Sequence, residues 1–142
     1  MSGGRLVVDT SALAAIALHE PEFERLLDAI AAADEVLMSA GSLQEFLLVM
    51  AGREVRGHGA QARLGDVVAD SRDLVRHLGI RVVEVTDALA VLGALGTATF
   101  RAGPARLNFG DGFAYALARA LSCPLLFVGN DFPSTDVAVA SV

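Results

Sequence analysis

The chain of 142 residues contains no lysine, so all 11 of its cationic side chains are arginines. A P-loop nucleotide site needs a lysine on the phosphates. Receiver-like and haloacid-dehalogenase-like phosphotransfer sites also normally place a lysine beside their aspartates. The missing lysine therefore argues against all three classes of site.

Long apolar runs and paired cysteines are missing as well. The longest early apolar run, Ala12–Leu18, is shorter than the roughly 18 residues of a membrane span. No basic leader followed by an apolar stretch and a cleavage site is evident. The lone cysteine, Cys123, cannot form an intrachain disulfide and is expected to be a small buried side chain. We therefore expect a cytoplasmic protein without a membrane segment.

The composition is acidic and rich in apolar residues. The net charge is −6, whereas a binder that works by neutralising nucleic-acid phosphates would be basic. A nuclease remains compatible with this charge, because clustered acids that bind metal lower the formal charge. The apolar fraction of 54% exceeds the usual 45–50% or so. It is consistent with an apolar surface for a partner chain or with a large monomeric core.

Histidines and serines give little sign of a site. None of His19, His58 and His77 has a second His or Cys at metal-ligand spacing, which argues against zinc. Ser11 and Ser42 lack a plausible His–acid partner at a nucleophile elbow, which argues against acyl transfer.

Strand-like and helix-like segments alternate along the chain, and the strands are near-continuous apolar runs. This pattern predicts an α/β fold with a parallel sheet covered on both faces, as a single domain over residues 1–142. The expected strands are Arg5–Val8, Glu35–Ser39, Ile80–Val85, Pro124–Val128 and a short one after Asp136. The expected helices are Thr10–Leu18, Pro21–Ala33, one opened by Ser42, Ala60–Leu78, one capped by Thr86–Asp87, and Asp111–Leu121, with Gly96–Gly110 irregular.

Four acids stand where strands end or helices begin: Asp9, Glu45, Asp111 and Asp131. Ligands of open α/β sheets gather at the carboxyl ends of the strands, so all four can share one edge of the sheet. Hard divalent cations such as Mg²⁺ prefer carboxylates, water and substrate phosphate as ligands. The placement indicates a metal site built from distant parts of the chain.

Each acid also has a simpler explanation. Asp9 can cap the first helix, and Ser42 with Glu45 fits a capping box. Asp111 can complement a helix dipole, and Asp131 can form an Asx-turn. For the aromatic side chains we favour the core over base-stacking platforms: Phe109, Phe113, Tyr115, Phe127 and Phe132.

In order and spacing, three groups of segments resemble PIN-domain ribonucleases of the VapC toxin family. The first is the opening Val7–Leu13 (VVDTSAL), and the second is Ser39–Phe46 (SAGSLQEF). The third is the most specific and consists of RLNFGDGFAYALA (106–118), PLLFVGNDF (124–132) and TDV (135–137). Together the segments cover essentially the whole chain.

The resemblance implies a three-layer α/β/α fold with a mainly parallel central sheet. It implies Mg²⁺- or Mn²⁺-dependent hydrolysis of RNA, a VapB-type antitoxin that blocks the site, and a homodimer. By motif position, Asp9, Glu45 and Asp111 are the expected metal ligands. Asp131 is the expected fourth catalytic acid, although Asn130 can occupy its place.

Further substrate contacts are expected from Thr10, Ser11, Asn130 and the arginines Arg101 and Arg106, which flank the loop before the third acid. The chain departs from many relatives at two positions, with Gly112 in place of Cys and Val128 in place of Lys. The second departure removes one cation that could hold RNA.

Two other functional classes stay open on the sequence. One is a catalytically weak PIN-fold module that only binds partners, which the acidic balance and the missing lysine favour. The other is a metal-dependent nuclease for DNA, or a phosphatase, because metal chemistry on a phosphate ester does not itself select the 2′-hydroxyl.

Overall fold

The structure is a computed structural model, and it describes residues 3–55 and 63–140. Four parallel strands form one sheet in the order β3-β2-β1-β4. The register pairs Leu6 with Val36, Val36 with Ile80 and Val7 with Leu125. The strands are β1 (Arg5–Val8), β2 (Glu35–Ser39), β3 (Ile80–Val83) and β4 (Leu125–Leu126).

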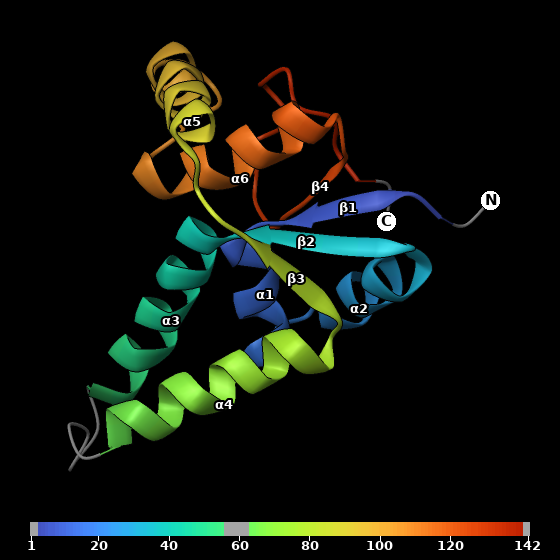
Figure 1. The fold of residues 1–142 in the computed structure, drawn as a ribbon, viewed down its shortest axis with the longest axis vertical. Coiled ribbons are helices and arrows are strands. Elements are labelled where there is room, and N and C mark those ends of the chain that lie inside the picture. Colours follow the sequence, from blue (N-terminus) through green and yellow to red (C-terminus); the bar gives the residue numbers. More distant parts are fainter. Residues whose placement is uncertain (1–2, 56–62, 141–142) are drawn as a thin grey trace.

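Helices cover both faces of the sheet (Figure 1). The first four helices lie below the sheet in this view and the last two lie above it. The three-layer α/β/α arrangement expected from the sequence is therefore confirmed. The helices are α1 (Thr10–Ala17), α2 (Phe23–Ala32), α3 (Ala40–Val55), α4 (Leu64–His77), α5 (Asp87–Phe100) and α6 (Phe109–Leu121).

The two core clusters follow from the alternation of side chains along the strands. Leu6 and Val8 of β1 pack with α1–α4, while Val7 between them packs with α6. Both faces of β1 are thus buried, which explains why its sequence is a continuous apolar run. In the described parts of the chain, every helix falls short of the length and hydropathy needed to cross a membrane.

Several expected boundaries were wrong at the ends of elements. The third and fourth strands are shorter than the expected Ile80–Val85 and Pro124–Val128, because the strands beside them end first: Val83 pairs with the last residue of β2, and Leu126 with the last residue of β1. The fifth strand is reduced to an isolated bridge between Leu125 and Val139.

Helix starts also differ from the expectation. The second helix begins at Phe23 because Pro21 lies in the preceding turn, after His19 in a left-handed conformation (φ 51°). The last helix begins at Phe109, two residues before the expected Asp111. The expected start of the fourth helix at Ala60 lies outside the described residues.

The stretch Gly96–Gly110 was expected to be irregular, but α5 continues through Gly96 to Phe100. Gly96 is buried against the ring of Tyr115 on α6, and an added Cβ would overlap that ring. This glycine therefore allows two helices to approach each other and does not end the first one.

We predict that Gly96→Ala destabilises the fold by about 1–3 kcal/mol, because the new methyl group overpacks the contact between α5 and α6. Gly52→Ala is the matched control, since nothing lies within 4 Å of the corresponding position on α3. The control should gain up to about 1 kcal/mol from helix propensity. Denaturant unfolding of both variants checks this, and equal stability changes would contradict the packing role of Gly96.

Candidate active site

Asp9 directly follows β1 and is the N-cap of α1. Its Oδ2 accepts hydrogen bonds from the Ser11 backbone N–H at 3.0 Å and from the Ser11 hydroxyl at 2.6 Å. Ser11 Oγ in turn accepts from the Val128 N–H at 3.0 Å, which ties this turn to the segment after β4. The other oxygen, Asp9 Oδ1, is buried and has no hydrogen-bond partner among the described residues.

Burial raises the pKa of Asp9 from 3.8 to about 6. The two hydrogen bonds from Ser11 lower this pKa, and the negative charges of Asp111 and Glu45 raise it further. A buried carboxylate that lacks a cation prefers its neutral form. The environment of Asp9 is therefore one that a positive charge would stabilise.

Asp111 lies in the first turn of α6 and takes part in a capping box with Asn108. The Asp111 N–H donates to Asn108 Oδ1 at 3.0 Å, and the Asn108 N–H donates to Asp111 Oδ2 at 2.9 Å. Burial raises the pKa of Asp111, the hydrogen bond from Asn108 lowers it, and the charges of Asp131 and Glu45 raise it. Its second oxygen, Oδ1, accepts no hydrogen bond from a described residue.

Glu45 reaches the same place from α3. The expected capping box of Ser42 and Glu45 is wrong, because α3 begins at Ala40, directly after β2. Instead, Ser39 Oγ accepts from the Gly41 N–H at 3.1 Å. Ser42 is fully buried inside the helix. The Glu45 carboxylate makes no cap and lies against Gly110, so that a Cβ added at Gly110 would overlap it.

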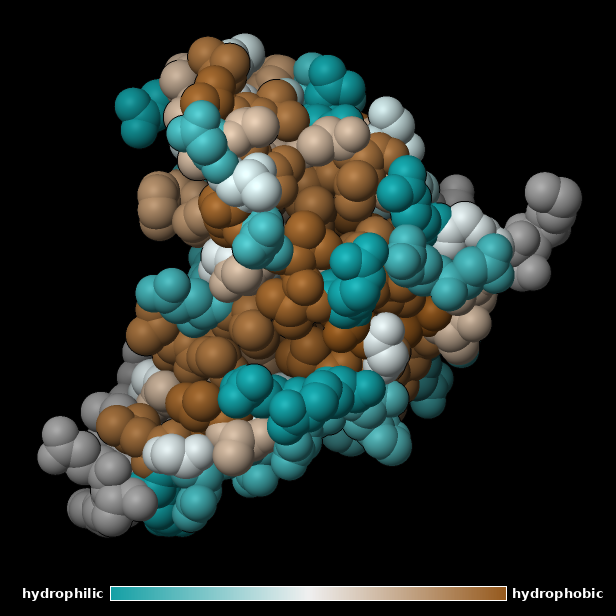
Figure 2. All heavy atoms as spheres, in the orientation of Figure 1, coloured by the Kyte–Doolittle hydropathy of each residue, from teal (hydrophilic) through white to brown (hydrophobic). Residues whose placement is uncertain are grey.

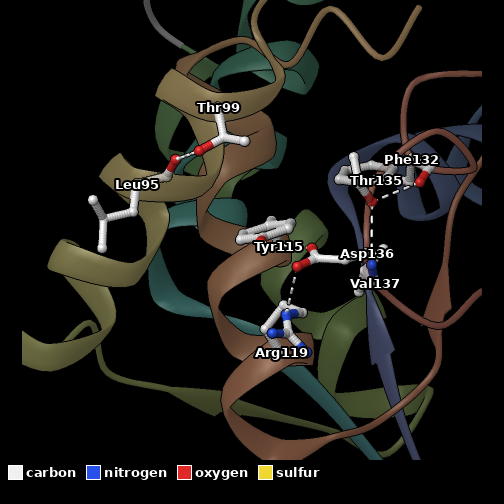
Figure 3. Close-up of polar contacts among 8 residues, drawn as sticks. All are labelled: Leu95, Thr99, Tyr115, Arg119, Phe132, Thr135, Asp136 and Val137. Atoms are coloured by element: carbon white, nitrogen blue, oxygen red, sulfur yellow. Dashed lines mark hydrogen bonds and ion pairs between the residues drawn. The ribbon is translucent and has the colours of Figure 1, made fainter.

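Asp131 is exposed on the segment after β4, but its charge acts on Asp111. That segment is anchored to α6 through Asp136, as Figure 3 shows. Tyr115 Oη donates to Asp136 Oδ1 at 2.7 Å, and Arg119 Nε lies 3.5 Å from Asp136 Oδ2. Phe132, next to Asp131, is 2% exposed and fixes the segment in the core.

The Thr135 hydroxyl completes this anchor, because it donates to the Phe132 carbonyl at 2.7 Å and accepts from the Val137 N–H at 3.3 Å (Figure 3). These contacts hold the segment after Asp131, and the hydrogen bond from the Val128 N–H to Ser11 Oγ holds it before Asp131. Asn130, the alternative fourth residue, is also exposed, and it makes no hydrogen bond with the described part of the chain.

The structure thus brings four acids together from four elements of the fold. Asp9 is affected by the charges of Asp111 and Glu45, and Asp111 by those of Glu45 and Asp131. The explanation of Asp9 as a helix cap is correct as well, and Asp111 lies in the first turn of α6, where its charge complements the helix dipole as expected. One oxygen of each carboxylate caps a helix, and the cap fixes where the second oxygen lies.

The other expected substrate contacts have different surroundings. Thr10 is buried and its hydroxyl donates to the Ser42 carbonyl at 2.9 Å, so it joins α1 to α3. Ser11 holds a carboxylate, that of Asp9. Arg101 is exposed and lines a cleft beside Asp111, whereas the exposed Arg106 is not part of that lining.

The donor set fits a hard divalent cation. As they lie within residues 3–55 and 63–140, however, no group of three or more His, Cys, Asp or Glu side chains is arranged so that it could hold a metal ion. Asp9 and Asp111 are fixed by their caps, whereas Glu45 and Asp131 make no hydrogen bond to a described residue and can turn toward a cation. The buried and unpartnered Asp9 Oδ1 is the specific observation that a cation would satisfy.

Sequence reasoning missed two residues at this site. Asn108 caps α6 and orients Asp111, and the pattern Asn-x-x-Asp before an apolar helix was the available signal. Phe109 was assigned to the core, but its side chain is 81% exposed. Its place directly after the cap residue gave a weak hint, because the first turn of a helix often faces solvent.

Comparisons with known proteins agree with this architecture. A family model for the PIN domain matches residues 6–138. Ribonuclease VapC30 of Mycobacterium tuberculosis is 35% identical over 143 residues, which covers 96% of this chain and 99% of that protein. Ribonuclease VapC of Mycolicibacterium smegmatis is 39% identical over 139 residues, covering 94% of this chain and 98% of that protein.

Solved structures resemble the fold at lower sequence identity. The Mycobacterium tuberculosis toxin VapC20, described as cleaving the sarcin–ricin loop, superposes with a TM-score of 0.72 at 18% identity, covering 96% of this chain and 99% of that one. A toxin–antitoxin complex from Klebsiella pneumoniae gives a TM-score of 0.68 at 16% identity, covering 95% and 96%.

The raised pKa of Asp9 predicts how stability depends on pH. Below about pH 3.8 this carboxyl is protonated in both the folded and the unfolded chain. Between 3.8 and about 6 the unfolded chain releases the proton first, so the contribution of Asp9 to the free energy of unfolding falls as pH rises. Above about pH 6 the destabilisation is complete.

We therefore predict that Asp9→Asn stabilises the metal-free protein by about 1–3 kcal/mol at pH 8 and has little effect near pH 3.5. Asparagine keeps the N-cap and removes the buried charge. Thermal and denaturant unfolding in EDTA at both pH values measures the difference, with Asp28→Asn on the exposed side of α2 as control. Lower stability of Asp9→Asn at pH 8 would contradict the account.

Proposed function

Given that this chain belongs to the PIN-domain family and to its VapC ribonuclease toxins, we propose that it is a metal-dependent endoribonuclease whose four acids hold Mg²⁺ or Mn²⁺. The convergence of Asp9, Glu45, Asp111 and Asp131 on one edge of the sheet carries this proposal. The relatives that are similar over nearly the whole chain are named ribonucleases, which supports RNA as the substrate.

In this proposal, Asp9 and Asp111 are the principal ligands through the oxygens that their caps leave free. Glu45 serves as a ligand or orients the attacking water, and Asp131 or Asn130 acts through water. A bound divalent ion would supply positive charge for the scissile phosphate and activate water for attack. Ser11 and Asn108 keep the two capped carboxylates from rotating away.

The charge of the site explains why the protein would need the ion for substrate binding. Four carboxylates at one edge repel a phosphodiester, and the charges of neighbouring acids raise the pKa of Asp9 and of Asp111. A cation between them removes both effects at once. The buried Asp9 has the most to gain, because its second oxygen has no partner among the described residues.

A VapB-type antitoxin and a second copy of this chain are the partners that we propose. The family supports the antitoxin, and the apolar surface supports assembly. Figure 2 shows apolar side chains gathered on the face between α4 and α5. Large exposed apolar residues occur on α3, on and after β3, and on α5: Leu48, Val49, Val82, Val85, Val91 and Leu95.

Cleavage of a labelled total-RNA pool tests the proposal. The purified protein, freed of any antitoxin, should give discrete fragments with Mg²⁺ or Mn²⁺ and none with EDTA. The double variant Asp9→Asn/Asp111→Asn should lose more than about 100-fold of this activity, because residues that merely support a metal ligand are already worth about 10- to 100-fold. Asp28→Asn should cleave like the parent chain.

Other outcomes would favour the other classes. Preferential cleavage of a DNA strand of matched sequence would indicate a DNA nuclease. A folded, metal-loaded protein that cleaves neither nucleic acid would indicate a PIN-fold module that only binds partners. Activity that survives EDTA and the double variant would remove the four acids from the chemistry.

A further inference from the structure

Phe109 has unusual surroundings for a large apolar side chain. It is the first residue of α6, and its side chain is 81% exposed. Full burial of a phenylalanine is worth roughly 1.5–3 kcal/mol, and the other apolar residues of α6 are largely buried. Its ring meets Phe113 edge to face, with centroids 5.1 Å apart and an interplanar angle of 82°. The contact with Phe113 covers one side of the Phe109 ring and leaves the other side exposed to solvent.

The ring forms one wall of a cleft of about 500 Å³ between α5 and α6. We call this the Phe109 cleft, and its volume lies within the usual range for small-ligand sites, about 300–1,000 Å³. Its lining is mainly apolar, with hydroxyl groups from Ser39 and Thr97 and one cation at Arg101. Arg101 makes no ion pair with any described residue, so its charge is free for a ligand.

The cleft borders the acidic site through residues next to Asp111 and β2, although none of the four acids is part of its lining. Gly112 and Phe113, which directly follow Asp111, line it, and so does Ser39 at the carboxyl end of β2. A ligand held at Asp111 by a phosphate would reach the Phe109 cleft with its next group by passing Gly112 or Phe113. That group must offer a flat apolar face for Phe109 and an anionic neighbour for Arg101.

These features point to a nucleotide more than to an apolar helix of a partner. The exposed apolar residues of α5 that a helix would cover, Val91 and Leu95, are not part of the cleft lining. They lie on another face of α5. The cleft instead combines an aromatic ring with the guanidinium of Arg101, and two of its lining residues directly follow Asp111. Single-stranded RNA is recognised by stacked bases beside bound phosphates.

The geometry points to the Phe109 cleft as a nucleobase subsite: an unpaired base next to the scissile phosphate stacks on Phe109, while Arg101 contacts a neighbouring backbone phosphate. This inference rests on the proposed ribonuclease function. It adds the place on the protein where an unstacked RNA base is bound. It also explains the exposure of Phe109, because the ring gains its burial only when substrate is bound.

A cycle of protein and substrate variants tests the subsite. Phe109→Ala should lower kcat/KM for a single-stranded RNA oligonucleotide about 5- to 150-fold, the value of one base stacked on an aromatic side chain. Phe109→Tyr should retain activity. An abasic nucleotide placed at successive positions around the cleavage point should weaken cleavage by the parent chain by a similar factor at one position. At that position Phe109→Ala should cause no further loss.

Two controls separate stacking from folding. Because Phe109 is exposed, the melting temperature of Phe109→Ala should be close to that of the parent chain. Val139→Ala shortens another exposed apolar side chain, 47% exposed and outside the cleft lining, and should leave cleavage unchanged. Arg101→Gln should reduce the slope of log(kcat/KM) against log[salt] by about 0.7, the loss of one phosphate contact on a single strand. Arg72→Gln on α4 should not.

Failure of this inference can be told apart from failure of the proposed function. If the parent chain cleaves RNA and Phe109→Ala cleaves equally well, the subsite is wrong and the nuclease stands. Equal losses on intact and abasic RNA at every position would also overturn stacking. Altered self-association or antitoxin binding with unchanged cleavage would assign the cleft to a protein partner.

A fluorescence reporter decides the case in which no cleavage is seen. The chain has no tryptophan, so Phe109→Trp places a single tryptophan in the cleft. Quenching by single-stranded RNA, reduced by abasic substitution, would support the subsite without any turnover. Tryptophan fluorescence that is unchanged by saturating RNA would overturn it.

Discussion

Repulsion among carboxylates at the carboxyl edge of a parallel sheet is the constraint on which the functional part of this structure depends. Asp9, Glu45, Asp111 and Asp131 come from four separate elements. The charges of Asp111 and Glu45 raise the cost of ionising Asp9, and those of Asp131 and Glu45 raise the cost of ionising Asp111. A parallel sheet brings such side chains together because its strands all end at the same edge. Hydrogen bonds that fix the acids in place and a bound cation both offset this repulsion. Protonation of some of the acids would also offset it, but a protonated carboxyl is a poor metal ligand.

The fixing is done by helix caps. Asp9 caps α1 with Oδ2, and Asp111 uses Oδ2 in the capping box with Asn108. Each carboxylate thus gives one oxygen to backbone N–H groups and keeps the other for the site. The same arrangement therefore serves both roles of these acids, as helix caps and as members of the site. Glu45 and Asp131 lack such bonds to described residues and are the adjustable members, with Asp131 placed through the anchor of Asp136 on Tyr115 and Arg119.

The sequence predicted what depends on local pattern. The apolar runs gave β1 and β2 with their correct bounds, and alternation gave the parallel three-layer fold. It failed where tertiary packing decides. Gly96 resembled a helix end and is a contact with Tyr115, and Ser42 resembled an N-cap but is the third residue of α3. Phe109 resembled a core residue because hydropathy does not show which face of a first helical turn meets solvent.

Manganese placed in crystals of the protein tests the central claim most directly, because its anomalous scattering locates the ion without reference to activity. The account predicts a peak bordered by Asp9 Oδ1, Asp111 and Glu45 at concentrations that support cleavage. The nearer of Asp131 and Asn130 would then be the fourth member of the site. Fully occupied manganese elsewhere on the protein, with no peak among these acids, would contradict it.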